Sequence, residues 1–178
     1  MAAVGVHGEG AGDGGEGEMT KDEMRAFIDG TDCVVKFRRL PHGWGLPVPS
    51  YASAGAAGID LRAAFTDERI EIAGGTMAEF ETGFAVEIPR GYEGQVRLRS
   101  SLGRLGLIIP NAPGTIDSDY RGEIRIVLAN IGTMTHTINR GDRVAQLIIA
   151  PVARASVVEV QELSETARGA GGFGSTGR

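Results

Sequence analysis

Several features that identify common protein classes are missing from this sequence of 178 residues. Cys33 is its single cysteine, so no disulfide can form within the chain, and a reducing compartment such as the cytoplasm is expected. No apolar run reaches the roughly 18 residues of a membrane-spanning helix, so we expect no membrane partner. The first residues lack a basic region followed by an apolar run, so we expect no secretory signal there.

Long basic runs and spaced metal ligands are also missing. The net charge of −5 comes from residues 1–23, which hold six acids and one base, so the rest of the chain is neutral. A neutral body without basic runs predicts no stable nucleic-acid binding. The three histidines are scattered at His7, His42 and His136, and we therefore expect no zinc-type ligand cluster.

Glycine is abundant, and it gathers at the two ends of the chain. Seven of the 28 glycines lie in residues 1–18, where glutamate and alanine also dominate and little can be buried. This composition predicts disorder. Capping-box spacing at Thr20–Glu23 then predicts a short helix ending near Gly30. We therefore interpret residues 1–32 as a disordered extension with one short helix.

From Cys33 onward the sequence consists of short apolar or alternating runs separated by glycine and proline turns. Many short strands at this spacing predict an all-β sandwich or barrel over residues 33–163. The expected strands are Val34–Phe37, Glu68–Ile72, Phe84–Ile88, Gln95–Arg99, Ile124–Leu128, Val144–Ile149 and Val157–Val160. Function in such a domain usually lies on the loops at strand ends.

Two glycine-containing polar segments interrupt the first half of this pattern. In 54–61, small residues precede Asp60, which suits either a close backbone approach to a ligand or a packing turn with a solvated carboxylate. In 99–103, Arg99, Ser100 and Ser101 supply donors without an acceptor charge. Those donors suit phosphate, and a serine-rich turn is the alternative.

A third polar segment, Asn111–Gly122, combines an amide with two nearby carboxylates. The amide of Asn111 can both donate and accept, as the recognition of a nucleobase edge requires. On a strand, Asp117 and Asp119 would share one face and could hold a metal or supply a base. A solvated hairpin edge is the alternative.

The fourth and fifth segments, 141–146 and 168–178, lie toward the end of the chain. Gln146 stands inside an apolar strand, so its amide is expected to bond a ligand, a water or a neighbouring chain. The tail at 168–178 combines glycines, hydroxyls and two arginines with the lone aromatic Phe173. We interpret residues 164–178 as a mobile arm that closes over a ligand, rather than as a plain disordered tail.

The five segments together resemble, in order and spacing, the five motifs of the trimeric dUTPase family, over Val34–Arg178. The segments 111–122 and 168–177 are the most specific to it. The resemblance implies an all-β, jelly-roll-like distorted barrel that forms a homotrimer with exchanged C-terminal arms. It also implies hydrolysis of the substrate dUTP to dUMP and pyrophosphate, with Mg²⁺ as cofactor.

The resemblance also implies a role for each matching residue. Asp117 would be the general base, Tyr120 would exclude a ribose 2′-hydroxyl, and Asn111 with the backbone of Gly114 would bind uracil. Asp60 would hold Mg²⁺ through water. The other residues expected to bind substrate, mainly through its phosphates or by stacking on uracil, are Arg99, Ser100, Ser101, Gln146, Arg168, Phe173, Gly174, Ser175 and Thr176.

Other functions, including that of a bifunctional deaminase–hydrolase, fit the sequence less well than this one. A dCTP deaminase shares the fold and part of the motif set, but it would lack the Phe-Gly-Ser-Thr arm. A regulatory nucleotide binder without hydrolysis would not need the intact Asp117 and arm. A purely structural trimer would not need Asn111, Tyr120 and Phe173 together.

Overall fold

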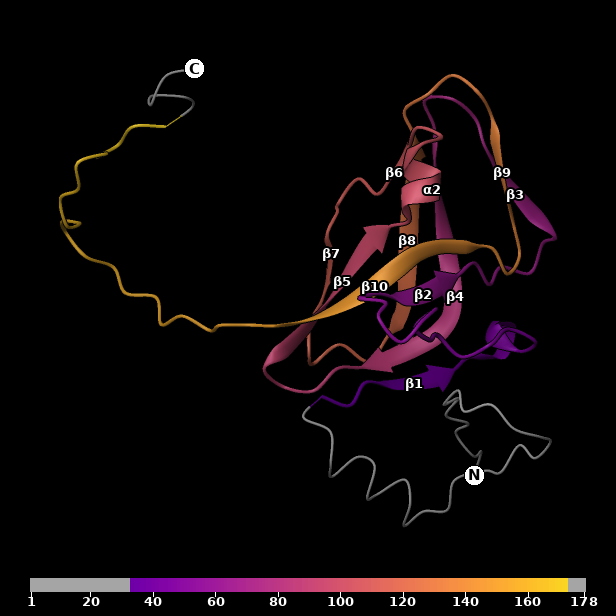
Figure 1. Cartoon of the computed structure of the whole chain (residues 1–178), viewed down its shortest axis with the longest axis horizontal. Helices are drawn as coiled ribbons and strands as arrows, with labels where there is room; N and C mark the ends of the chain where they lie inside the picture. Colours follow the sequence, from indigo (N-terminus) through magenta and orange to yellow (C-terminus); the bar gives the residue numbers. More distant parts are fainter. Residues whose placement is uncertain (1–32, 173–178) are drawn as a thin grey trace, which may run out of the picture.

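The computed structural model describes residues 33–172, and its regular structure is almost entirely antiparallel β-sheet (Figure 1). One four-stranded sheet has the order β1-β4-β8-β6, a second has the order β2-β10-β5-β7, and β3 pairs with β9. The elements are β1 (Lys36–Arg39), η1 (Pro41–Gly43), β2 (Ile59–Arg62), β3 (Arg69–Ile72), β4 (Met77–Glu87), β5 (Tyr92–Leu98), α2 (Ser100–Gly103), β6 (Leu107–Ile108), β7 (Gly114–Ile116), β8 (Glu123–Asn130), β9 (His136–Asn139) and β10 (Arg143–Pro151).

The core lies between the two four-stranded sheets. Phe80 of β4 and Leu128 of β8 belong to the same buried cluster as Leu61 of β2 and Leu147 of β10, and all four are fully buried. Alternation along β8 explains this arrangement, because every second residue from Ile124 to Asn130 is buried while the residues between them are more exposed. The all-β, jelly-roll-like fold expected from the sequence is therefore confirmed.

Several strands differ from their expected positions. The strand expected at Phe84–Ile88 is the end of the much longer β4, because Gly83 adopts a positive φ of 74° and the register with β8 shifts between Glu81 and Ala85. This bulge breaks the alternation by which the strand would have been detected. The first strand is also displaced, to Lys36–Arg39, and pairs along its length with β4.

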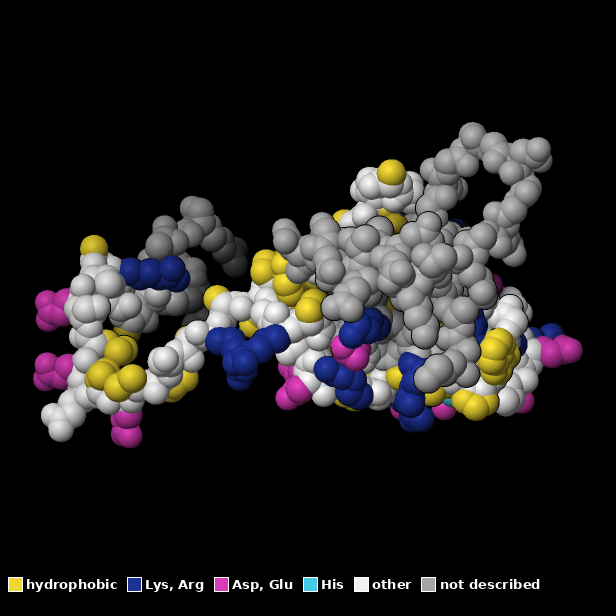
Figure 2. Space-filling view, turned by 90° about the horizontal axis from the view of Figure 1, so that it is seen from below, with side chains coloured by type: hydrophobic (Ala, Val, Ile, Leu, Met, Phe, Trp, Pro, Cys, Tyr) yellow, Lys and Arg dark blue, Asp and Glu magenta, His cyan; other side chains and the backbone are white. Residues whose placement is uncertain are grey.

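The strand expected at Val157–Val160 is absent, so that prediction was wrong. Residues 152–170 are exposed and leave the sheets after β10, as Figures 1 and 2 show. Val157 is 95% exposed, since this stretch has β-forming side chains but no neighbouring strand among residues 33–172 with which to pair. We call residues 152–172 the C-terminal segment.

Within residues 33–172, no helix has the length and apolar character needed to cross a membrane. The extension and short helix expected in residues 1–32 lie outside the described part of the chain.

Candidate functional site

Asp60 is the centre of a polar cluster built from β2, β10 and Arg99, the residue that follows β5. Its side chain is only 8% exposed. The Arg143 guanidinium donates to Oδ2 at 3.0 Å and the Gln146 amide donates to Oδ1 at 3.3 Å, while Nε of Arg99 lies 3.5 Å from Oδ1. We call these four residues the Asp60 cluster. It unites three of the five polar segments singled out in the sequence.

Strand register explains why these residues meet. Asp60 is directly opposite Gln146 in the β2–β10 pair, and Gln146 is opposite Arg97 in the β10–β5 pair. Opposed residues in a sheet point to the same face, so the amide of Gln146 reaches the carboxylate across the ladder. The expected need of this amide for a partner is met by Asp60 within the same chain.

The cluster carries one net positive charge, because two guanidinium groups surround a single carboxylate. Arg99 and Arg143 keep 25% and 39% of their side-chain surface exposed, so part of each guanidinium remains open to a ligand. Ser100 and Ser101 follow Arg99 directly at the start of α2, and both are exposed. This set of donors suits an anion with several oxygens, such as a phosphate chain.

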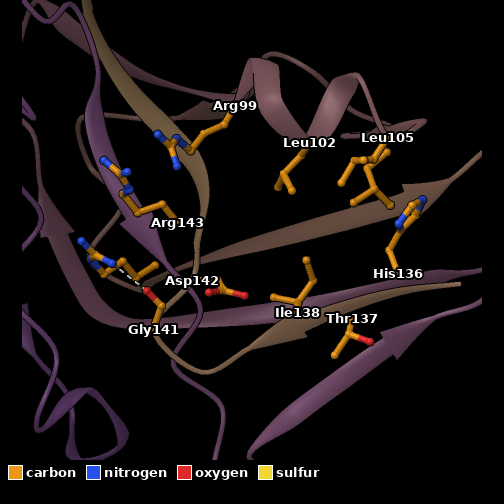
Figure 3. Close-up of a pocket in the computed structure, with 11 residues that line it drawn as sticks. Arg99, Leu102, Leu105, His136, Thr137, Ile138, Gly141, Asp142 and Arg143 are labelled. Carbon is orange, nitrogen blue, oxygen red and sulfur yellow. Dashed lines mark hydrogen bonds between the residues drawn. The ribbon is translucent and has the colours of Figure 1, made fainter.

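A cavity of about 330 Å³ opens beside the cluster (Figure 3). The guanidinium groups of Arg99 and Arg143 lie at one end of it, and Leu102 and Leu105 lie across from Ile138 farther along. Arg62 also lines this cavity and donates to the carbonyl of Gly141 at 2.7 Å. The cavity is thus cationic at the end beside the cluster, and farther along it is lined by apolar side chains together with His136 and Thr137.

The third polar segment forms a short strand followed by a turn. β7 pairs with β5, and the amide N–H of Tyr120 donates to the carbonyl of Asp117 at 3.1 Å to close the turn. Asp117 and Asp119 therefore lie in a turn and not on a strand, so the shared face considered for them is not formed. The Asp117 side chain is exposed.

The ring of Tyr120 folds toward the residues that follow this turn, Gly122 and Glu123. Its hydroxyl donates to the carbonyl of Glu123 at 2.7 Å. A Cβ atom at Gly122 would lie 2.4 Å from that hydroxyl, so only glycine allows the ring to fold back here. Asn111 lies near Gly114, with its amide nitrogen 3.4 Å from the place where a Cβ atom at Gly114 would stand.

The Asp117 turn and the Asp60 cluster lie at opposite ends of β5. Ile116 is opposite Gly94 in this antiparallel pair, so the next residue, Asp117, lies beside Glu93. Arg99 follows the other end of β5, six residues after Glu93. At 3.3 Å per residue this separation is about 20 Å. A single chain therefore does not bring the expected base to the expected phosphate donors.

The arm is described only in part. Arg168 is exposed, and its Nε donates to the carbonyl of Gly171 at 2.8 Å. The other expected arm residues, Phe173, Gly174, Ser175 and Thr176, lie outside the described residues.

Arg143 is the main addition that the structure makes to the expected site. It lies in the fourth polar segment but carried no assigned role, although it makes the shortest contact to Asp60. Its position at the entry of a buried strand was the available signal. No local sequence pattern predicts their contact, because the two residues are 83 positions apart in the sequence.

The fold and the cluster define a class, namely an all-β sandwich with a donor-rich cavity suited to an anion. Comparison with known proteins narrows this class. The dUTPase family model matches residues 45–177, and the chain belongs to the dUTPase family.

Curated relatives and solved structures agree with this membership. The chain is 56% identical over 149 residues to the deoxyuridine 5′-triphosphate nucleotidohydrolase of Rhizobium etli, covering 83% of this chain and 96% of the relative. It is 54% identical to the protein of the same name from Anaplasma marginale, covering 80% and 97%.

Among solved structures, a Staphylococcus bacteriophage 80alpha dUTPase variant with dUpNHpp has a TM-score of 0.73 and 25% identity, covering 83% of this chain and all of the other. A dUTPase variant from phage phi11 of S. aureus, described as coordinating a structural Mg(II) ion, has a TM-score of 0.64 and 26% identity. This match covers 72% of this chain and 97% of the phage chain.

Proposed function

We propose that this protein is a cytoplasmic enzyme that hydrolyses dUTP to dUMP and pyrophosphate. The reaction would keep uracil out of DNA and supply dUMP for dTMP synthesis. The observation that carries the proposal is the family match over residues 45–177, which includes the Asp60 cluster, the Asp117 turn and the arm. The donor-rich cluster, with its surplus positive charge, supports a polyanionic substrate.

The Asp60 cluster and α2 bind the phosphates in this proposal. Arg99 and Arg143 neutralise charge, and the hydroxyls of Ser100 and Ser101 donate to phosphate oxygens. Asp60 orients both guanidinium groups, because it contacts each of them from a buried position. Such preset donors stabilise the charge that develops in phosphoryl transfer without reorganising during the reaction.

The Asp117 turn binds the nucleoside and activates water. The Asp117 carboxylate accepts a proton from a water that attacks the α-phosphorus, and pyrophosphate leaves. Its exposed position at the start of a hydrogen-bonded turn supports this role, since a base must reach the proton it takes. Tyr120 packs under the deoxyribose, and Asn111 with the backbone of Gly114 binds the uracil edge.

Mg²⁺ fits this site through water rather than by direct ligation. The Asp60 carboxylate offers about four lone-pair positions, and its contacts with Arg143, Gln146 and Arg99 leave room for one water. A divalent ion on a triphosphate commonly keeps several waters. When bound, Mg²⁺ would neutralise the phosphate chain, and Asp60 would hold one water of its shell.

The functional unit in this proposal is a homotrimer whose sites combine residues of different chains. The separation of about 20 Å along β5 supports this, because Asp117 must act beside the phosphates that Arg99 and Ser100 bind. The C-terminal segment supports it as well, since Val157, Val158 and Leu163 are 95%, 74% and 86% exposed and suit burial against another chain.

The arm then closes over a neighbouring site. Phe173 stacks on uracil, while Arg168, Ser175 and Thr176 bind the γ-phosphate and Gly174 lets the chain pass close to the nucleotide. Arg168 supports this role by its exposed guanidinium, which contacts only the local carbonyl of Gly171 among the described residues.

The deciding experiment is a pyrophosphate-release assay with dUTP, dCTP, dTTP and UTP at equal concentration. We expect release from dUTP alone at a substantial rate. Ammonia release from dCTP would instead identify a deaminase of the same fold. Tight dUTP binding without pyrophosphate would identify a regulatory binder, and either result would overturn the proposal.

The assembly is tested separately by measuring the mass of the protein in solution by light scattering. A trimer is expected at all concentrations that support turnover. An active monomer would show that the composite site is wrong.

A further inference from the structure

His42, Glu81 and Glu123 form a cluster of potential metal ligands that the proposed reaction does not use. Nε2 of His42 lies 2.6 Å from Oε1 of Glu123 and 3.8 Å from Oε2 of Glu81. One ligand atom from each of the three residues can be chosen so that all lie within 4.8 Å of one another. We call these residues the His42 triad. It belongs to η1, β4 and β8, and thus to the sheet that does not contain the Asp60 cluster.

Carboxylates beside the triad outnumber the one guanidinium that pairs with them, while the guanidinium groups of Arg39 and Arg140 bind the carbonyls of Gly43 and His42 instead. The Arg125 guanidinium pairs with both Glu79, at 2.9 Å, and Glu81, at 3.3 Å. One positive charge is therefore shared by two carboxylates, and Glu123 adds a third carboxylate nearby. A divalent cation would neutralise this surplus.

The backbone around the triad holds the ligands in place. Oε1 of Glu123 accepts the amide N–H of Gly83 at 2.7 Å, and this carboxylate is 10% exposed. The carbonyl of His42 accepts a hydrogen bond from Arg140 at 2.8 Å. A Cβ atom at Gly43 would lie 2.4 Å from the carbonyl oxygen of Gly83, so η1 packs directly on the β4 bulge. These contacts resemble the supporting hydrogen bonds that orient ligands in metal sites.

We propose that the His42 triad binds one divalent transition-metal ion of the Zn²⁺ class, with water as the fourth ligand. One imidazole and two carboxylates are the ligand types that Zn²⁺ accepts, at about 2.0–2.2 Å. Tetrahedral coordination at that distance places ligand atoms roughly 3.3 Å apart. The His42–Glu123 contact must therefore open slightly and Glu81 must move inward, which its surface position allows.

The imidazole separates this site from the proposed Mg²⁺ position. Mg²⁺ prefers oxygen ligands and retains its waters, whereas imidazole nitrogen favours zinc, copper, iron and nickel. An ion at the triad would also act next to the Asp117 turn, because Glu123 is the first residue of β8 and its carbonyl accepts the Tyr120 hydroxyl. The ion would thereby connect Glu123, which follows that turn, to η1 and β4.

The test is metal binding by the full chain without nucleotide. Isothermal titration with Zn²⁺ should give one site per chain, and Co²⁺ should give the visible absorption of a four-coordinate ion. His42→Gln should weaken Zn²⁺ binding at least tenfold and abolish the Co²⁺ bands. Millimolar Mg²⁺ should not displace either ion.

Matched variants distinguish the triad from other histidines and from folding defects. His136→Gln, in β9, should bind Zn²⁺ as the unchanged protein does. Glu81→Gln changes a side chain that is 39% exposed, so it should fold normally and still weaken binding severalfold. No zinc binding, or equal binding by the His42→Gln and His136→Gln variants, would show that the triad is only a hydrogen-bonded ion pair.

Discussion

Gly122 gives a direct way to test the role of Tyr120 without altering the tyrosine itself. Replacing Gly122 by alanine places a methyl group 2.4 Å from the Tyr120 hydroxyl and 2.5 Å from the adjacent ring carbon. Non-bonded contacts of carbon lie near 3.5 Å, so the end of the ring must retreat by about 1 Å. The hydroxyl would then lose its hydrogen bond to the carbonyl of Glu123.

The two consequences of this shift differ in size. A lost hydrogen bond on a side chain that is 41% exposed should lower the free energy of unfolding by only about 1 kcal/mol. A misplacement of about 1 Å beside a reacting substrate can cost as much as 10²-fold. We therefore expect kcat/KM for dUTP to fall by about 10- to 100-fold, with the ratio of UTP to dUTP hydrolysis rising about tenfold because the ring no longer blocks the 2′-hydroxyl.

Steady-state pyrophosphate release with dUTP and UTP measures this ratio, and thermal unfolding measures the stability. Gly55→Ala is the matched control, since a Cβ atom there meets nothing within 4 Å. An unchanged UTP to dUTP ratio in Gly122→Ala would refute the proposed contact between Tyr120 and the sugar. A collapse of stability would show that the backbone moves instead of the ring.

Three further predictions address the base, the arm and the cysteine. Asp117→Asn should retain dUTP binding by calorimetry but lose at least about 10²-fold in kcat, and near-normal turnover would exclude the base role. Deleting residues 168–178 should abolish turnover while light scattering still reports a trimer, because the exposed apolar residues that suit burial against another chain, Val157, Val158 and Leu163, are retained; a loss of the trimer would make the arm structural. Burial raises the pKa of the Cys33 thiol, so less of it is present as thiolate near pH 8. Ellman's reagent should therefore react with Cys33 more slowly than with free cysteine, and an equal rate would contradict the burial.

Much of the sandwich was predictable, because its main strands alternate between buried and exposed residues. Ile124 to Leu128 is the clearest example. β9 escaped detection because Ile138 is its only buried residue, and β2 because three successive residues are buried and the alternation disappears. The failed strand at Val157–Val160 has suitable side chains but no partner strand in the part of the chain that the structure describes, and strand propensity alone does not supply one.

The sequence singled out three of the four residues of the Asp60 cluster, but not their arrangement. The motif segments identified Asp60, Arg99 and Gln146 from local composition, whereas the contacts among them depend on strand register. The same limit applies to the His42 triad. The scattered histidines argued against a zinc-type cluster, yet η1 places His42 beside Glu123, which lies 81 positions away.

The length of β5 has a genetic consequence if the two halves of a site come from different chains. A subunit defective at Asp117 still offers an intact Asp60 cluster, and a subunit defective at Arg99 still offers an intact turn. Two inactive alleles can then complement each other in mixed trimers, because some sites combine the intact turn of one variant subunit with the intact Asp60 cluster of the other. In the same way, the product of one damaged allele lowers the activity of the normal subunits with which it assembles. A mutation that would be recessive in a monomeric enzyme would therefore be partly dominant in this trimer.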